Sequence, residues 1–275
     1  MSKVKVNGCD IWYEISGKGA PVVQIGGAVS GHEGYALVTP DMAKHFAVLD
    51  YDHRGYGMSD RPEQTYTMDT WADDLKSLLD ALGIEKTHVH GGSMGGYIAI
   101  KFATKYPERV DRLIINGAAA KSDFTCRCQF EVWKAVALKY GMDSDELAEE
   151  LCTKAFSRAW LDGPNGGEKA VKGMRDSTAP NASLHVFLEA CDAMIETDVT
   201  HELGRVNSPT LLMVGSEDVL TPVDQGPGGA GMRYMHEHIK GSELWIAEGS
   251  GHGLLVERAQ ESVNKVIDFL RAGAR

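Results

Sequence analysis

Apolar and polar residues alternate near the N-terminus, and short apolar runs follow. Residues 4–6 and 11–15 alternate on either side of Asn7-Gly8, a dipeptide typical of a tight hairpin turn. Residues 21–25 and 46–50 form short, mostly apolar runs, interrupted only by Gln24 and Asp50. Runs of this length without alternation indicate strands that are covered on both faces. The pattern therefore predicts an antiparallel hairpin that leads into a buried sheet.

Helical periodicity begins after residue 67. Apolar residues from Met68 to Leu82 recur every three or four positions, with Thr67 suited to cap the helix start and Gly83 suited to end the helix. A strand over 87–90, a helix over 93–106 and a strand over 112–116 follow. Alternating strands and helices are typical of a mainly parallel sheet with helices on both faces.

The rhythm changes between residues 121 and 201. Large apolar residues recur there at helix-like intervals, and no β-branched run interrupts them. Strand patterns return at 209–215 and 243–246, and an amphipathic helix is expected over 259–270. We expect an α/β core formed by residues 1–120 and 202–275, with residues 121–201 inserted as a helical cap.

Composition excludes several classes of protein. The chain has 275 residues, of which 43% are hydrophobic, and no apolar run approaches the length of a membrane span. A net charge of −11 opposes binding to nucleic acids and anionic membranes. The five cysteines, without a recognisable secretion signal, favour reduced thiols in a cytoplasmic protein.

Three local patterns resemble cofactor or metal motifs, but none has the context that such a motif needs. Cys126 and Cys128 are spaced too closely for a zinc knuckle, and His236 and His238 point to different faces of an expected helix. Residues 226–231 match a dinucleotide glycine pattern outside any strand–helix–strand unit, so we interpret them as a loop insertion. We therefore expect neither metal nor cofactor.

The most informative segment is Gly91-Gly92-Ser93-Met94-Gly95, a G-x-S-x-G motif between an expected strand and an expected helix. In that context the serine occupies a sharp turn that raises its hydroxyl above the sheet edge. Glycines are needed two positions before and after it, because a Cβ there would collide with the neighbouring strand and helix. Ser93 is therefore the candidate nucleophile. The amide of Met94 is a candidate donor to an oxyanion.

A serine needs a base, and the base needs an acid that orients it. In this strand–turn–helix context the chain order is serine, acid, histidine. Asp218 follows the expected strand at 209–215, and His252 lies in a glycine-rich loop after the strand at 243–246. We expect these two residues to complete the triad, with Glu217 as the nearest rival acid.

The loop after residue 25 supplies the second oxyanion donor in this prediction. The amide of Ala28 is the first choice and that of Gly27 the alternative. In the segment from 52 to 59, Arg54 is interpreted as a scaffold residue that could hold Asp52 and nearby carbonyls. The candidate substrate contacts are His32, Trp133 and Trp160, with plain exposure as the alternative for His32 and core packing for the two tryptophans.

Together these motifs resemble the α/β-hydrolase superfamily, in its branch of small capped serine hydrolases. They cover most of the chain: Asp52-x-Arg54-Gly55-x-Gly57-x-Ser59, Gly91-Gly92-Ser93-Met94-Gly95-Gly96, residues 209–218 and Gly251-His252. The resemblance implies the same triad of Ser93, Asp218 and His252, with the amides of Met94 and Ala28 as the oxyanion hole. A serine at the turn disfavours the superfamily's dehalogenases and epoxide hydrolases, which carry aspartate there.

The chain departs from the family pattern at three places. Gly26-Gly27 replaces a common His-Gly pair, Gly92 replaces a bulkier residue before the serine, and Gly253 stands where ring-cleavage C–C hydrolases typically carry tryptophan. The last departure weighs against C–C hydrolysis.

The expected function is hydrolysis of a small carboxylic ester or lactone through an acyl-enzyme on Ser93. The alternatives are another triad reaction on this fold, such as C–C bond hydrolysis, and a slow-turnover receptor that binds a small ligand. The expected partner is a small molecule, and the oligomeric state, a homo-oligomer included, stays open.

Overall fold

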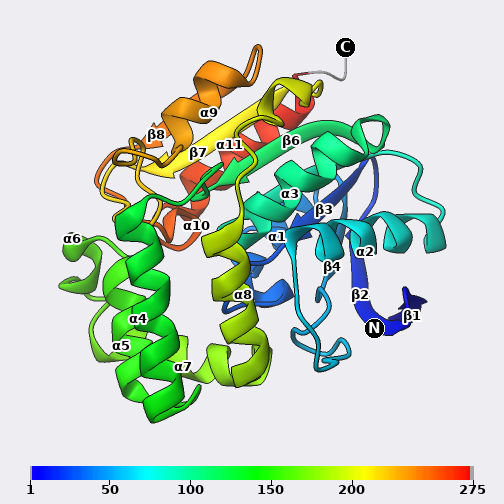
Figure 1. The fold of residues 1–275 in the computed structure, drawn as a ribbon. Helices are drawn as coiled ribbons and strands as arrows, with labels where there is room; N and C mark the ends of the chain where they lie inside the picture. The colour runs from blue at the N-terminus through cyan, green and yellow to red at the C-terminus, as the bar shows by residue number, and fades with distance from the viewer. Residues whose placement is uncertain (1, 273–275) are drawn as a thin grey trace.

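The computed structural model describes residues 2–272, which form a sheet between two layers of helices (Figure 1). Eight strands in these residues make one sheet in the order β1-β2-β4-β3-β5-β6-β7-β8. The β1–β2 and β2–β4 pairs are antiparallel, and the remaining pairs are parallel, which confirms the predicted mainly parallel sheet. The strands are β1 (Ser2–Val6), β2 (Cys9–Gly17), β3 (Pro21–Ile25), β4 (Ala47–Tyr51), β5 (Thr87–Gly92), β6 (Val110–Asn116), β7 (Thr210–Gly215) and β8 (Glu243–Ala247).

The N-terminal hairpin turns where the sequence predicts it. Val6 pairs with Cys9 across the turn, and Asn7 and Gly8 both have positive φ, at 47° and 87°. Two consecutive residues with positive φ give the turn a twist that matches the strands, and asparagine and glycine tolerate this conformation best.

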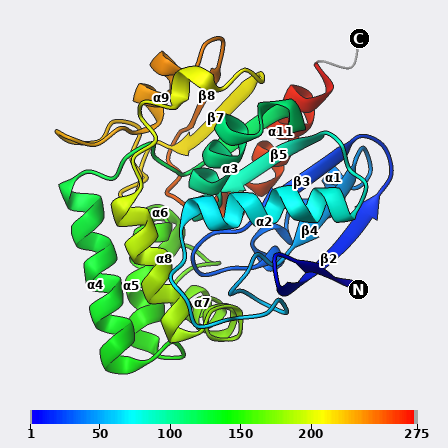
Figure 2. The same ribbon diagram turned by 45° about the vertical axis from the view of Figure 1, so that its right-hand side comes forward.

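The parallel strands pack against helices on both faces. Val23 and Leu49 belong to the core under α2 and α3, whereas their neighbours Val22 and Val48 belong to the core under α11. Successive side chains of a strand point to opposite faces, so most positions of these strands are apolar. Figure 2 shows α2 and α3 in front of the sheet and α11 behind it. The helices of the two layers include α1 (Thr39–Met42), α2 (Met68–Ala81), α3 (Met94–Lys105), α9 (Met232–His238), α10 (Leu254–Glu257) and α11 (Ala259–Arg271), with short 3₁₀ turns η1 (His32–Tyr35), η2 (Pro107–Arg109) and η3 (Leu203–Arg205).

The start and end of α2 follow the predicted signals. The Thr67 hydroxyl accepts a hydrogen bond from the amide of Thr70 at 3.1 Å, and Gly83 follows the helix with φ +69°. Among the helices that the structure describes, none is both long and apolar enough to cross a membrane.

Residues 121–201 contribute helices and no strand to the described sheet. These helices group together at one side of the sheet (Figure 1). That residues 121–201 form a cap inserted into the α/β core stays a prediction, and so do its boundaries. The helices are α4 (Phe124–Tyr140), α5 (Asp145–Ala155), α6 (Arg158–Leu161), α7 (Glu168–Asn181) and α8 (Leu184–Glu196).

Arg54 does not hold Asp52, contrary to the sequence interpretation. Its Nε and Nη2 donate to the two carboxylate oxygens of Asp74 in α2, at 2.6 and 2.8 Å. Asp52 instead accepts from Nδ1 of His32 at 2.8 Å and from two backbone amides. The scaffold role is kept, because a bidentate pair between buried side chains joins the loop after β4 to α2.

His53 is a fully buried imidazole within this scaffold. Its ring lies 4.0 Å from the Tyr56 ring and 5.9 Å from the Trp71 ring, centroid to centroid. Neither ring nitrogen has a hydrogen-bond partner among the residues that the structure describes. Burial without a partner lowers the pKa of His53 to about 4.

We therefore expect His53 to make the fold sensitive to acid. In the unfolded chain His53 takes up a proton near pH 6.5, and in the folded chain only near pH 4. The unfolded state therefore binds more protons between these values, and the free energy of unfolding falls as the pH is lowered through this window. The loss of unfolding free energy between pH 7.5 and pH 4.5 should be about 2 kcal/mol smaller in His53→Phe, measured by urea unfolding. The exposed-site variant His45→Phe should match the wild type, and an equal loss in all three proteins would contradict the assignment.

Candidate active site

Ser93 lies at a strained turn between β5 and α3. Its φ and ψ are 53° and −123°, a left-handed conformation that a residue with a side chain rarely adopts. A Cβ on Gly91 would lie 2.2 Å from the carbonyl oxygen of Gly95, and one on Gly95 would lie 2.1 Å from that of Ile25. Only glycine fits at both positions, so the G-x-S-x-G spacing is a requirement of the local backbone.

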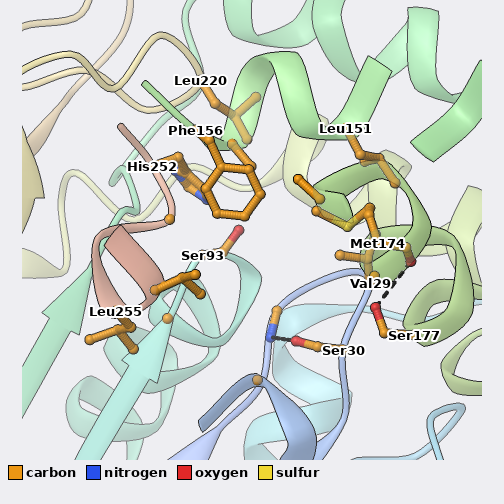
Figure 3. A pocket seen from close by; sticks show the side chains of 18 of the residues that line it. Val29, Ser30, Ser93, Leu151, Phe156, Met174, Ser177, Leu220, His252 and Leu255 are labelled. Carbon is orange, nitrogen blue, oxygen red and sulfur yellow. Dashed lines mark hydrogen bonds between the residues drawn. The ribbon is translucent and has the colours of Figure 1, made fainter. Parts of the chain in front are cut away.

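The turn presents the Ser93 hydroxyl to a cavity. The Ser93 amide donates to the carbonyl oxygen of Asn116 at 2.9 Å, which ties the turn to the end of β6. Figure 3 shows the hydroxyl pointing towards the side chains of Phe156 and His252. The serine is half-buried and open to the cavity.

The loop after β3 passes directly beside Ser93. A Cβ on Gly27 would lie 3.2 Å from the Ser93 Cβ, so a side chain at this position would crowd the serine. The Gly27 amide donates to the Ser30 hydroxyl at 3.4 Å. Within the described part of the chain, the amides of Ala28 and Met94 have no such partner. Ala28 thus fits the role of second oxyanion donor better than Gly27.

Asp218 and His252 form a hydrogen-bonded pair at the ends of two neighbouring strands. Asp218 follows β7, His252 follows β8, and Oδ2 of the aspartate lies 2.9 Å from Nδ1 of the histidine. Asp218 also accepts from the Leu220 amide at 2.9 Å, and from the amide and hydroxyl of Thr221 at 2.8 and 3.0 Å. Each carboxylate oxygen of Asp218 therefore takes part in two hydrogen bonds.

These contacts set the charge of Asp218. Burial favours its neutral form, but the His252 ring and the donors of Leu220 and Thr221 outweigh burial and hold the pKa of Asp218 below its usual value. The carboxylate is charged at neutral pH and accepts the proton on Nδ1 of His252, which leaves Nε2 free to act as a base.

Glu217 does not share this environment. Its side chain is exposed, whereas that of Asp218 is buried, although both residues border a second surface depression. The aspartate, rather than its neighbour, contacts the histidine.

The cavity above Ser93 has a volume of about 420 Å³. Trp133 and Trp160 line it, as the sequence interpretation expects of substrate contacts, and their role towards a substrate stays a prediction. His32 is not among the lining residues, because its ring binds Asp52 and lies 4.1 Å from the Trp12 ring. The remaining walls include Tyr35, Asn116, Leu151, Phe156, Met174, Ser177, Leu220, Leu255 and Val256.

Several residues of this site carried no recognised sequence signal. Asn116 and Phe156 line the cavity, and Thr221 holds Asp218. Only Thr221 has a local signature, since a hydroxyl residue three positions after an aspartate often closes a turn with it. The other two come from elements distant in sequence.

Glu257 joins the His252 loop to the helical insertion. Its carboxylate accepts from the Ser157 amide at 3.0 Å, from the Ser157 hydroxyl at 2.6 Å and from the Gly251 amide at 2.9 Å. The Gly253 amide donates to the Ala155 carbonyl at 2.6 Å. The residues before and after His252 are thus both tied to the segment between α5 and α6.

The same close approach explains Gly253. A Cβ there would lie 2.5 Å from Cε1 of Phe156, whose ring stacks on Trp160 with centroids 4.3 Å apart. The aromatic side chain beside His252 therefore comes from the helical insertion, and a tryptophan at 253 would collide with it.

The loop at residues 226–231 packs against the start of α4. Asp123 accepts from the Gly226 amide at 2.7 Å, and Ala230 forms an isolated bridge with Lys121. This insertion therefore braces the point where the chain leaves the sheet for the helical segment, a structural account that its glycine pattern did not suggest.

One group of side chains in the described chain has the spacing of metal ligands, namely His32, Glu33 and Asp52. The hydrogen bond between Nδ1 of His32 and Asp52 accounts for this spacing. Cys126 is buried and Cys128 exposed on α4, so the two thiols do not share an environment. We assign no metal to either group.

Comparison with known proteins gives one family and close structural relatives. Residues 20–259 match the model of the alpha/beta hydrolase fold family. The chain is 30% identical to the AB hydrolase superfamily protein YisY of Bacillus subtilis, over 94% of this chain and 93% of that protein. It is 31% identical to 3-oxoadipate enol-lactonase 2 of Acinetobacter baylyi, over 79% and 75%. The enol-lactonase structure from Burkholderia xenovorans LB400 superposes with a TM-score of 0.85 at 24% identity, over 98% of this chain and 99% of that one.

Glu257→Ala is expected to loosen the His252 loop, because the Ser157 and Gly251 amides lose their acceptor. The downfield proton resonance of the His252 Nδ1–H should broaden or disappear, and stability should fall by about 2 kcal/mol. Glu257→Gln should restore the resonance, since its amide oxygen still accepts from both backbone donors. The exposed-site control Glu261→Ala should resemble the wild type, and an unchanged resonance in Glu257→Ala would refute the coupling.

Proposed function

Because this chain belongs to the alpha/beta hydrolase fold family, we propose that it is a serine hydrolase that cleaves a small carboxylic ester or lactone. The observation that carries the proposal is the hydrogen bond between Asp218 and His252, with His252 lining the same cavity as the strained Ser93. The similarity to an enol-lactonase along most of the chain supports the lactone.

In the proposed reaction, Nε2 of His252 takes the Ser93 proton as Oγ attacks the substrate's carbonyl carbon. The electron pair of the C=O bond moves to the oxygen, and the amides of Met94 and Ala28 donate to this oxyanion. Asp218 keeps the imidazolium in place through its hydrogen bond to Nδ1, where the two atoms are 2.9 Å apart.

The tetrahedral intermediate then collapses. The C–O bond to the leaving oxygen breaks, and His252 gives its proton to that oxygen, which departs as an alcohol or, in a lactone, stays attached as a ring-opened hydroxyl. Water then attacks the acyl carbon while His252 takes a proton from it. The bond between that carbon and Ser93 Oγ breaks, His252 returns the proton to Oγ, and the acid departs.

The cavity suits a small acyl group. Its volume of about 420 Å³ and its largely apolar walls match a compact ligand with few polar atoms. Trp133 and Trp160, which the helical insertion supplies, would contact that ligand. No separate cofactor has a part in the proposed steps.

Ser93→Ala should abolish hydrolysis of short p-nitrophenyl esters and lactones and should prevent labelling by a fluorophosphonate. The fold should persist, because alanine fills the same space, and circular dichroism checks this. A panel that includes a vinylogous 1,5-diketone tests C–C hydrolysis in parallel. Labelling that survives in Ser93→Ala, or a folded wild type that is not labelled, would refute the proposal.

Asp218→Asn should lower kcat by several orders of magnitude, because an amide in place of the carboxylate favours the wrong tautomer of His252. Glu217→Gln is the matched control on the adjacent exposed residue and should retain kcat. Steady-state kinetics of the three proteins on one ester decide the point. A larger loss in Glu217→Gln than in Asp218→Asn would reassign the acid.

A further inference from the structure

We propose that the side-chain amide of Asn116 forms a donor subsite that selects acyl groups with a neutral oxygen close to the reacting carbonyl. Keto, ether and hydroxyl oxygens belong to this class. The inference rests on the proposed ester or lactone hydrolysis and specifies the acyl part of its substrate.

Asn116 lies beside the nucleophile at the end of β6. It is the register partner of Gly92, and its carbonyl oxygen accepts from the Ser93 amide at 2.9 Å. The residue is 6% exposed, and it lines the cavity. The Asn116 side chain and Ser93 therefore line the same cavity from neighbouring backbone positions.

The hydrogen bond to His90 determines which end of the amide is free. Oδ1 of Asn116 lies 2.9 Å from Nε2 of His90. Burial lowers the pKa of His90 to about 4, so the ring is neutral at pH 7 and carries one proton. With the proton on Nε2 donated to Oδ1, the unpartnered Nδ1 is an acceptor, which costs less than a buried unpaired donor.

Nδ2 of Asn116 remains without an acceptor among residues 2–272. The Tyr35 hydroxyl on this wall is engaged, because its single proton is shared between the carbonyl oxygens of Ile25 and His90, both at 3.1 Å. The Asn116 amide thus supplies a side-chain donor to this wall that the protein itself does not use.

Gly92 keeps this donor open to the cavity. A Cβ at position 92 would lie 3.0 Å from Nδ2 and 3.2 Å from Oδ1 of Asn116. Any side chain there would cover the amide, and the glycine exposes it. The unusual residue before the serine therefore has a physical consequence for what the cavity can bind.

The surroundings decide the type of acceptor. Tyr35 and Leu255, which line the same cavity, are uncharged, and both are buried in the core under α11. The cation that lines this cavity, Lys169, belongs to α7, and its Nζ donates to the Pro164 carbonyl at 3.1 Å. A carboxylate held against Tyr35 and Leu255 would lose its water without a counter-charge from these two side chains, whereas a neutral oxygen needs only one donor. We therefore assign the subsite to a neutral acceptor.

The test compares two nearly isosteric esters, p-nitrophenyl butyrate and p-nitrophenyl methoxyacetate, in which an ether oxygen replaces one methylene. The quantity is the ratio of their kcat/KM values, methoxyacetate over butyrate, in each protein. Intrinsic reactivity cancels when ratios are compared between variants. The proteins are wild type, Asn116→Leu, Asn116→Asp and the control Ser177→Ala, whose hydroxyl already donates to the Met174 carbonyl.

Asn116→Leu should lower the ratio about 5- to 10-fold, the value of one neutral hydrogen bond. Asn116→Asp keeps an acceptor for His90 and removes the donor, so its ratio should fall at least as far even if the leucine variant folds poorly. Ser177→Ala should keep the wild-type ratio.

Equal ratios in wild type and both Asn116 variants would overturn the subsite while leaving the proposed hydrolysis intact. A fall of the same size in Ser177→Ala would also overturn it, because the preference would then belong to the cavity in general. A folded wild type that hydrolyses neither ester would remove the proposed function and this inference with it.

Discussion

The positive φ of Ser93 is the constraint on which the rest of the site depends. A non-glycine residue in this conformation costs about 1–3 kcal/mol, and the surrounding structure has to hold it there. The holding contacts are the hydrogen bond from the Ser93 amide to the Asn116 carbonyl and the close approach of Gly91 and Gly95 to neighbouring backbone. These contacts require a parallel sheet with strands on both sides of β5, so the strained turn and the α/β fold are parts of one arrangement.

The histidine is held from two directions. Asp218 binds its ring from the sheet, and Glu257 and Ala155 tie the flanking residues Gly251 and Gly253 to the helical insertion. The insertion therefore does more than cover the cavity, because the loop that carries His252 depends on it for its position. Displacing the segment between α5 and α6 would alter the cavity and the base together.

Glycines near the site mark places where two segments meet. Gly27 leaves room for the Ser93 side chain, Gly92 exposes Asn116, and Gly253 makes room for Phe156. Each of these glycines departs from the common family pattern or lies next to a residue that does. In each case the absence of a side chain is explained by a neighbouring residue that the linear sequence does not indicate. The shape of the cavity floor thus follows from where side chains are absent.

The sequence alone determined the parallel sheet, the hairpin at Asn7-Gly8, the serine turn, and the places of Asp218 and His252 after successive strands. Those features depend on periodicity and turn chemistry within a few residues, which a single chain displays directly. Only the tertiary structure decided that Arg54 binds Asp74, that His32 binds Asp52, and that Glu257 and Asn116 belong to the site. These contacts join residues that are 20 to 100 positions apart or that face a common cavity, and their pairing is set by how the packed elements approach one another.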